Sequence, residues 1–528
     1  MRRLIQLVIP CVLLSGCFGP GEGVEVPKGE IYFPVGLAVS RDGNADEKPD
    51  YLFVVSSDFD LQYNGGAVQS YDLDKLERSL PKRCVVDADC TGEDEDGTPS
   101  LGPVCQPGGM CAASRDESDS PCPQGDRADA DRLLFPGRCN PIKPTEPKLQ
   151  ISAVKIGAFA TDVLLRERPE NKTAALDAPE RLFVPVRGDS TLHWLDVNAK
   201  GELECGQEGA SDHACNDRHR AGDKPEDNPR KITLNPEPFA LDADARGDQI
   251  VVTNQTTGTA ALFLNDAWDK DGPQLSFELA SDSIPERVVG IAAVPPPAPA
   301  EADAPSSFMM TFRNSAQVRL IRFAPDSTST DPTNAPRPYL IDGGGVGIEA
   351  NSVGADSRGI AIDDSARKAA TLRCAAGDTT CTDAAALVPL DVYVANRSPS
   401  SLLIGRTQPP QEYPYFFQTV PLTTGPSRVV VGQVYAPNGQ DKETRVFVAC
   451  FESRRIFVYD PQRSRVETEI LTGRGPHAMA VDTARKLLYV GHFTDSYVGV
   501  YSLDLASPAT YGTMLGTLGV PKQPRASK

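Results

Sequence analysis

The chain repeats one pattern of short apolar runs separated by polar turns. It is clearest in residues 475–504, where the apolar runs 478–481, 487–490 and 498–503 alternate with polar turns. This alternation is typical of half-buried antiparallel strands. Three such strands bury too little apolar surface to be stable alone, so the pattern predicts that copies of it pack together.

Seven copies can be aligned on a small residue in the first run of each. The aligned residues are Ala38, Ala160, Ala240, Ala292, Ala361, Val430 and Ala480. A second and a third apolar run follow each of them, and a fourth, less regular run leads into the next copy. Seven repeats of four antiparallel strands predict an all-β fold, a seven-bladed β-propeller with a disulfide-rich loop insertion, over residues 31–528.

The motif P-x-x-x-A-V-D, followed by L-Y-V and then V-x-V-Y-x-L, resembles the YVTN and NHL types of propeller repeat. The resemblance covers most of the chain from about residue 31 onward. It implies the propeller architecture and leaves the activity open, because propellers of this class serve as lactonases, binding platforms and scaffolds.

The long segments between the runs are expected on one face of the propeller. Strands of a blade alternate in direction, so links from first to second strands and from third to fourth strands emerge on the same side. The long links of these two kinds are residues 42–50, 166–180, 295–307, 364–388, 433–444, about 82–147 and 199–228. The sequence therefore predicts one decorated face and one face of short loops.

Ten cysteines fall into three groups within these segments, as oxidised pairs would. They are Cys84, Cys90, Cys105, Cys111, Cys122 and Cys139 in the segment 82–147, Cys205 with Cys215, and Cys374 with Cys381. The first group predicts three disulfides, whose connectivity the sequence leaves open. Cys450 stands apart in a second run and is expected to be a buried, unreactive thiol.

The amino terminus has the features of a secretory signal. Arg2 and Arg3 precede an apolar stretch, residues 4–14, that is too short to span a bilayer permanently. Residues 14–17, Leu-Ser-Gly-Cys, resemble the lipobox of bacterial lipoproteins. The resemblance implies that residues 1–16 are removed, that Cys17 is lipidated, and that residues 17–30 link the anchor to the propeller. Phe18, in place of an aspartate after the cysteine, implies an outer-membrane lipoprotein on the periplasmic side or at the cell surface.

The charge of the chain restricts its partners. It carries 72 acidic and 53 basic residues, a formal net charge of -19. That charge opposes binding to nucleic acids and to anionic lipid surfaces. We therefore expect no nucleic-acid partner, a membrane attachment through the lipid anchor only, and a monomer.

Two segments carry residue types that bind metals. Residues 87–97 space their carboxylates like a calcium loop, but Thr98 stands where such a loop has a glutamate. His213 and His219 lie near Cys205 and Cys215, a set of zinc-ligand types, although an oxidising compartment would pair the two cysteines. We therefore expect no cofactor, no zinc, and at most a weak site for calcium or another divalent metal in a solvated acidic loop.

The face of short loops is the predicted place for a binding site, because its loops surround the mouth of the central channel. In addition to Arg287, which precedes a first strand on this face, the candidate ligand contacts are Arg187, Asp189, Asn254, Arg313, Arg358, Arg397, Arg428, Glu452, His477, His492 and Asp495. The arginines could hold an anionic ligand, and His477, His492, Asp189 and Asp495 could hold a metal. The same residue types are common in turns, so the alternative is that these loops only connect strands.

These observations favour a non-enzymatic binding or scaffold module that engages an envelope protein or a surface polymer. The alternative is a hydrolase that resembles lactonase-type propellers, with a metal or a histidine and arginine pair polarising an ester carbonyl. The sequence contains no serine nucleophile elbow, metalloprotease motif or phosphate-binding loop, so it predicts no catalytic residue.

Overall fold

The structure is a computed structural model of the chain. It describes residues 23–521 apart from 43–47, 91–101, 116–140, 146–147, 170–171, 173–177, 209, 211, 266–267, 269–271, 281–283, 297–305, 326–336 and 349–355. The predicted signal peptide, the lipidation site Cys17, and Cys122 and Cys139 lie outside the described residues. None of the helices in the described ranges has the length and apolar character needed to cross a bilayer.

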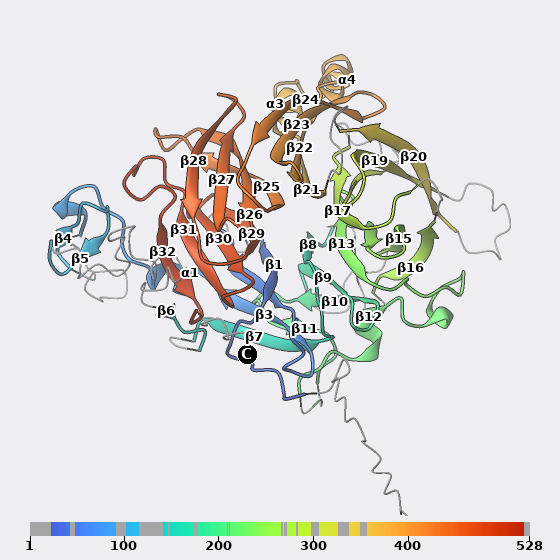
Figure 1. Cartoon of the computed structure of the whole chain (residues 1–528), viewed down its shortest axis with the longest axis horizontal. Coiled ribbons are helices and arrows are strands. Elements are labelled where there is room, and N and C mark those ends of the chain that lie inside the picture. Colours follow the sequence, from blue (N-terminus) through green and yellow to red (C-terminus); the bar gives the residue numbers. More distant parts are fainter. Residues whose placement is uncertain are drawn as a thin grey trace, which may run out of the picture.

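Seven β-sheets stand in a ring around a central channel, which confirms the predicted propeller (Figure 1). Blade one contains β1 (Pro34–Val39), β2 (Tyr51–Ser56), β3 (Gly66–Asp72) and β7 (Gln150–Ile156). Blade two contains β8 (Leu164–Glu167), β9 (Glu180–Val186), β10 (Thr191–Val197), β11 (Leu203–Glu204) and β12 (Arg220–Ala221). Blade three contains β13 (Pro238–Ala243), β14 (Gln249–Asn254), β15 (Thr259–Leu264) and β16 (Gln274–Leu279).

The remaining four blades follow the same order along the chain. Blade four contains β17 (Val288–Val294), β18 (Ser307–Phe312), β19 (Gln317–Ala324) and β20 (Tyr339–Gly347). Blade five contains β21 (Ser357–Asp363), β22 (Asp391–Arg397), β23 (Ser400–Gln408) and β24 (Tyr413–Pro421). Blade six contains β25 (Pro426–Tyr435), β26 (Lys442–Cys450), β27 (Arg455–Asp460) and β28 (Arg465–Leu471), and blade seven β29 (Pro476–Asp482), β30 (Leu487–His492), β31 (Tyr497–Ser502) and β32 (Met514–Leu518).

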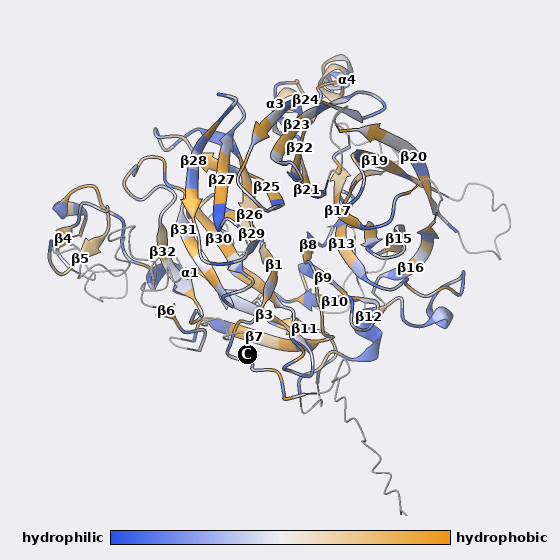
Figure 2. Ribbon diagram, in the orientation of Figure 1, coloured by the Kyte–Doolittle hydropathy of each residue, from blue (hydrophilic) through white to orange (hydrophobic). Residues whose placement is uncertain are grey.

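The core lies between the blades. The middle strands β2, β14, β22, β26 and β30 are buried along most of their length, because each is covered on both faces by neighbouring blades. In Figure 2 the apolar residues accordingly follow the strands, and polar residues gather in the links between them. Phe53, Phe183 and Tyr489 are fully buried in such positions. Packing of blade on blade therefore stabilises sheets that would be too small to fold alone.

The alignment of the repeats was wrong in two blades. Ala160 occupies only an isolated bridge, opposite Val186, and the residue equivalent to Ala480 in blade two is Leu164, which pairs with Phe183. In blade three the equivalent residue is Asp242, two positions after Ala240. A shift by an even number of residues keeps the same side chains facing inward, so the alternation of apolar residues could not reveal the error.

Blade two also lacks the continuous fourth strand that was expected after residue 228. Two short strands, β11 and β12, pair with β10 instead, and both lie inside the predicted link 199–228. The disulfide between Cys205 and Cys215 follows β11 and holds this segment against the blade. In blade six the predicted link 433–444 shortens to residues 436–441, because β25 and β26 extend as a long hairpin.

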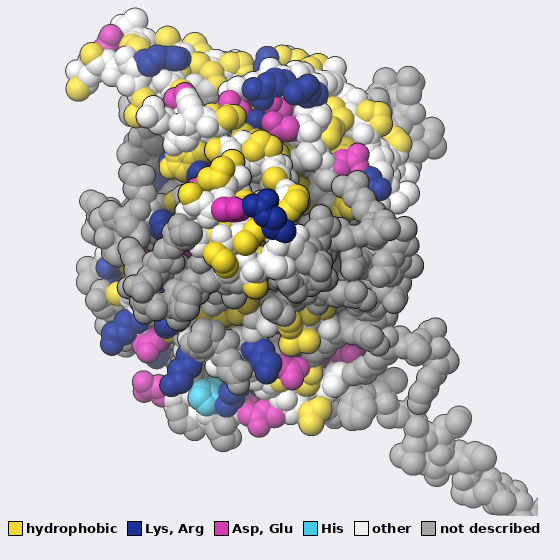
Figure 3. All heavy atoms as spheres, turned by 90° about the vertical axis from the view of Figure 1, so that its left-hand side faces the viewer, with side chains coloured by type: hydrophobic (Ala, Val, Ile, Leu, Met, Phe, Trp, Pro, Cys, Tyr) yellow, Lys and Arg dark blue, Asp and Glu magenta, His cyan; other side chains and the backbone are white. Residues whose placement is uncertain are grey.

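The insertion between β3 and β7 begins with the helix α1 (Leu73–Arg78) and the 3-10 turn η1 (Asp87–Cys90). Its small sheet, β4 (Val104–Cys105) with β5 (Cys111–Ala112), projects beyond the rim of the disc in Figure 1. Two of the predicted disulfides are formed, Cys84–Cys105 and Cys90–Cys111. Figure 3, viewed from this side, shows basic and acidic side chains intermingled over the described surface.

The link between β21 and β22 folds into the helices α3 (Ser365–Leu372) and α4 (Thr379–Ala386), which the disulfide Cys374–Cys381 joins. Consecutive strands of each blade pair antiparallel, so this link and the insertion after β3 leave the propeller on the same side. The turns after β2, β9, β14, β18, β22, β26 and β30 emerge on the opposite side. The strand directions thus agree with one decorated face and one face of short loops.

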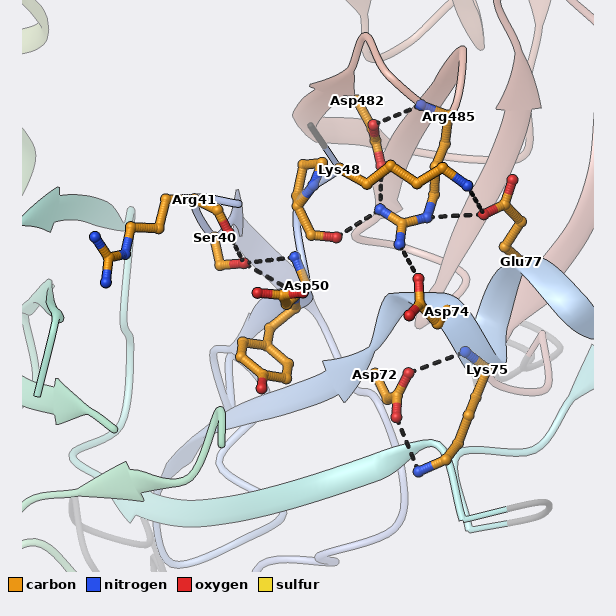
Figure 4. Close-up of polar contacts among 12 residues, drawn as sticks. Ser40, Arg41, Lys48, Asp50, Asp72, Asp74, Lys75, Glu77, Asp482 and Arg485 are labelled. Carbon is orange, nitrogen blue, oxygen red and sulfur yellow. Dashed lines mark hydrogen bonds and ion pairs between the residues drawn. The ribbon is translucent and has the colours of Figure 1, made fainter. Parts of the chain in front are cut away.

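Ring closure between blades one and seven depends on side chains, because each of these blades is built from its own end of the chain. Arg485 lies in the turn between β29 and β30 and is almost fully buried. It reaches α1, where its Nε donates to Glu77 at 3.0 Å and one of its terminal nitrogens contacts Asp74 (Figure 4). The same guanidinium contacts Asp482 and the carbonyl of Pro49. A further link comes from the insertion, whose strand β6 (Pro141–Ile142) pairs parallel to β32.

Candidate functional site

Seven equivalent backbone hydrogen bonds define the mouth of the channel on the face of short loops. In each blade a residue ahead of the inner strand accepts, through its carbonyl, a hydrogen bond of 2.7–3.2 Å from a residue at or just after the end of the second strand. The accepting residues are Phe33, Phe159, Glu237, Arg287, Asp356, Gly425 and Gly475, and their donors are Ser57, Arg187, Gln255, Arg313, Arg397, Phe451 and Phe493 in the same order. These fourteen positions form a ring whose backbone is fixed and whose side chains vary.

The backbone at six of the seven accepting positions is left-handed. Gly425 and Gly475 have φ values of 87° and 68°, which glycine adopts without strain. Phe33, Phe159 and Arg287 have φ values of 43°, 60° and 65° at the equivalent places. A bulky residue with positive φ costs about 1 kcal/mol or more, and such strain is concentrated at functional sites.

One ion pair crosses the channel below the mouth. Arg428 of blade six contacts Asp162 of blade two, on the far side of the ring. The equivalent positions in the other blades hold small residues, Gly36, Ala240, Gly290, Gly359 and Ala478. The channel around this pair is a cavity of about 190 Å³, lined by residues of the inner strands. Burial raises the pKa of Asp162, and Arg428 counteracts that rise.

Arginines are concentrated in blades four to six of the mouth. Arg358 makes a bidentate contact with Asp356 at 2.6 and 2.8 Å, and Arg397 pairs with Glu452. Burial and the nearby positive charge of Arg358 lower the pKa of Arg313 and of Arg397. Among the described residues, the side chains of Arg287 and Arg313 have no ion-pair partner. This part of the mouth therefore holds more positive than negative charge.

The other predicted contacts divide into two groups. Arg187 lies at the mouth and pairs with Glu237 of the next blade at 2.5 Å. Asp189 is half-buried; burial acts to raise its pKa, but hydrogen bonds from His193 and Thr191 within blade two lower it overall. Asn254 is fully buried and donates to the carbonyl of Asn235 at 2.7 Å. Asn254 and Asp189 thus hold their own loops.

His477 and His492 do not form a joint site. His492 is fully buried, stacks on Tyr497 with centroids 4.2 Å apart, and lies 3.2 Å from the Tyr501 hydroxyl. Asp495 pairs with Arg474. Within the described part of the chain, the only cluster of three metal-ligand types is Cys84, Cys90 and Cys105, which are disulfide-bonded. The residues suggested for a metal at the mouth are therefore engaged separately.

His477 does lie at the mouth, between blades six and seven. Burial, together with the positive charges of Arg428 and Arg358, lowers its pKa to about 3. Its ring is neutral at neutral pH, but an imidazole with so low a pKa is a weak general base. The hydrolase alternative expects a histidine near an arginine, and His477 lies near Arg428 and Arg358. This histidine is nevertheless poorly suited to proton abstraction.

The two suggested metal segments outside the mouth are engaged in other contacts. Asp87 pairs with Arg115 at 2.6 Å, and Asp89 accepts from the backbone of Val85 and Val86. Residues 91–101 of the acidic run lie outside the described residues. Cys205 and Cys215 form the predicted disulfide, and His219 stacks on Trp194 with ring centroids 3.8 Å apart.

Sequence reasoning missed the aromatic residues of the mouth. Four of them belong to the seven bonded pairs: Phe33, Phe159, Phe451 and Phe493. Phe59 packs on Phe33, Phe159 and Phe493. A signal for Phe33 was available, because it stands five residues before Ala38, as Gly475 stands five before Ala480. For Phe159 the displaced alignment of blade two concealed the equivalence.

The comparison with solved structures returns matches of low identity that cover most of the chain. A Bacteroides fragilis protein proposed to be a 6-phosphogluconolactonase aligns over 84% of this chain and 86% of its own, with 11% identity and a TM-score of 0.41. The periplasmic gluconolactonase of Pseudomonas aeruginosa aligns over the same shares, with 13% identity and a TM-score of 0.42. A functionally unknown protein of Desulfotomaculum acetoxidans covers 71% of this chain and 93% of its own, at 13% identity and a TM-score of 0.40. No family model and no curated protein matches the sequence.

Proposed function

We propose that the protein is a binding module of the bacterial cell envelope, anchored at the outer membrane through a lipid on Cys17, and that its channel mouth takes an anionic ligand. The ligand belongs to an envelope protein or to a surface polymer. The propeller is a rigid frame for this role, because the bonded ring at the mouth fixes the backbone while the side chains remain free to vary.

The crowding of arginines at the mouth is the observation that carries the proposal. The chain has a net charge of -19, yet burial lowers the pKa of Arg313 and the nearby positive charges of Arg358, Arg287 and Arg397 lower it further. Like charges repel one another, so gathering them costs free energy that an anionic ligand would recover. Guanidinium groups suit such a ligand, because they form bidentate, charge-assisted hydrogen bonds with carboxylates and phosphates.

Binding of a polyanion to the purified protein tests this function. We expect polyglutamate to bind in calorimetric titrations, to bind more weakly as salt is raised, and to lose about tenfold in affinity in Arg313→Gln. The matched control is Arg406→Gln. It removes an exposed arginine near the end of β23 that lies away from the mouth, where Arg406 pairs with Asp391 at 2.7 Å. Binding that is absent, or that both variants weaken equally, would contradict the proposal.

A further inference from the structure

Five phenylalanine rings form a continuous group on the mouth face, which we call the aromatic row: Phe33, Phe59, Phe159, Phe451 and Phe493. The centroid of Phe59 lies 6.1 Å from Phe159 and 5.2 Å from Phe493, and Phe493 lies 6.2 Å from Phe451. Phe33 packs against both Phe59 and Phe493, at 6.1 and 5.1 Å. Phe59 is 52% exposed, and the other four rings are half-buried. An apolar group that is partly open to solvent in this way offers a contact surface.

The backbone shows that these rings are placed at a cost. Phe33 and Phe159 adopt left-handed φ values at positions where Gly425 and Gly475 serve blades six and seven. The channel does not need phenylalanine there, since glycine maintains the same carbonyl hydrogen bond. Glu237 and Arg287 carry the same strain in blades three and four, so it marks the accepting positions of the mouth, and in blades one and two it falls on two rings of the aromatic row.

The aromatic row meets the arginines at His477. The His477 ring lies 6.4 Å from Phe451 and 6.4 Å from Phe493, so it closes one end of the row. Burial depresses its pKa, and Arg428 and Arg358 are near enough to depress it further. The mouth therefore has an aromatic part in blades one, two, six and seven and a cationic part in blades four to six, with the neutral His477 at the junction.

We propose that the mouth binds an acidic peptide segment of an envelope protein, which inserts an apolar side chain among the rings of the aromatic row and directs its carboxylates to the arginines. This inference rests on the proposed function and specifies its ligand. The charges are complementary, because the arginines of blades four and five attract carboxylates while the phenylalanines offer no polar group.

The orientation of the rings favours a peptide over a polysaccharide. Phe59 meets Phe159 at an interplanar angle of 90° and Phe493 at 74°, and Phe493 is inclined by 52° to Phe451. Rings set edge to face form a three-dimensional receptor for a branched or aromatic side chain, which packs against several of them at once. A flat sugar ring would instead need a broad parallel platform and hydrogen-bonding groups beside it.

A pair of labelled peptides tests the inference on the whole protein. The probe is Glu-Asp-Phe-Asp-Glu, blocked at both ends, and its partner has alanine in place of phenylalanine. We expect fluorescence anisotropy to show about tenfold tighter binding of the phenylalanine peptide, and we expect Phe59→Ala to abolish that difference. The matched control is Phe417→Ala, which removes a phenylalanine of similar exposure, 51%, from the outer strand β24.

Each outcome separates this inference from the proposed function. Equal affinity for the two peptides, with binding still dependent on Arg313, would overturn the inference that the ligand has an apolar anchor. The same result would support the proposal that the mouth binds anions. A polyuronate that binds more tightly than either peptide and depends on Phe59 would assign the mouth to an acidic polysaccharide. No binding of peptides, polyglutamate or polyuronate would overturn both proposals. Circular dichroism of Phe59→Ala and Phe417→Ala checks that both variants fold.

Discussion

At the scale of single residues, burial sets the protonation of several groups that the sequence presents as ordinary. Cys450 is fully buried and forms no disulfide, and burial was predicted from its place in a second run. Burial raises its pKa to about 11, so its thiol is protonated at neutral pH. His477 and His492 are held neutral in the same way. These shifts make the stability of the propeller depend on pH.

Glu180 gives the clearest prediction of that kind. It lies at the start of β9, is 2% exposed, and accepts a hydrogen bond of 2.7 Å from the backbone of Arg41 in blade one. Burial raises its pKa from 4.5 to about 7, although the Arg41 hydrogen bond opposes the rise. The folded state therefore binds a proton that the unfolded state has released, and stability is lost as the pH rises from about 4.5 through about 7.

Glu180→Gln removes this titration and keeps the shape of the side chain. We expect its unfolding free energy to exceed that of the unchanged protein at about pH 8 by up to roughly 3 kcal/mol, and the advantage to disappear near pH 4. Urea unfolding at both pH values measures the difference. Glu202→Gln, at an exposed position of the same blade, serves as the control. An advantage that is equal at both pH values would refute the explanation.

The residues of the mouth were predictable only in part. Arg313, Arg358, Arg397, Arg428 and His477 could be assigned to the mouth from the strand order alone, since each adjoins a predicted strand end. The partners of these residues could not be predicted, because ion pairs such as Arg428 with Asp162 join residues that are far apart in the chain. His492, Asn254 and Asp495 share the residue types of a site and turn out to bond within their own blades.

At the scale of elements, the strands themselves were the most predictable feature. A pattern that recurs seven times specifies where strands occur, and the second and third strands follow it in all seven blades, whereas the first and fourth strands of blade two depart from it. The exact equivalence of blades two and three was not predictable, because a displacement by an even number of residues preserves the pattern. Loop segments such as residues 199–228 contribute their own short strands, which carry no periodic signal.

The contact between α1 and the turn after β29 is the element that joins the two ends of the ring. Arg485 has 1% of its side chain exposed and contacts Asp74, Glu77 and Asp482. Removing its charge would leave the buried Asp482 without its charged partner, so we expect Arg485→Gln to lower the unfolding free energy by about 3 kcal/mol. Arg455→Gln, which disrupts the exposed pair with Glu469, should cost less than about 1 kcal/mol. Thermal and urea unfolding compare them, and equal losses would show that Arg485 does not hold the ring closed.

At the scale of the whole molecule, the two faces differ in how their links are held. Each turn after a second strand is tied to the segment ahead of an inner strand by one of the seven carbonyl hydrogen bonds, whereas the opposite face carries the longest links, residues 73–149 and 364–390 among them. Limited proteolysis of the folded protein should therefore cut between residues 82 and 147 and between 364 and 388 first. The turns at Asn254 and Arg313 should remain intact, as mass spectrometry of the fragments would show. Equal cleavage on both faces would contradict this assignment.

The Arg485 contact has a consequence for the order in which the protein is completed. Every blade consists of one continuous stretch of chain, apart from the two residues of β6 that join blade seven, so each can form as its own residues emerge during synthesis. Pro49, Asp74 and Glu77 emerge early but meet their partner only when Arg485 follows, more than four hundred residues later. Until then blade one has an uncovered side. A chaperone that shields newly made protein would find its target there, and its departure would coincide with closure of the ring.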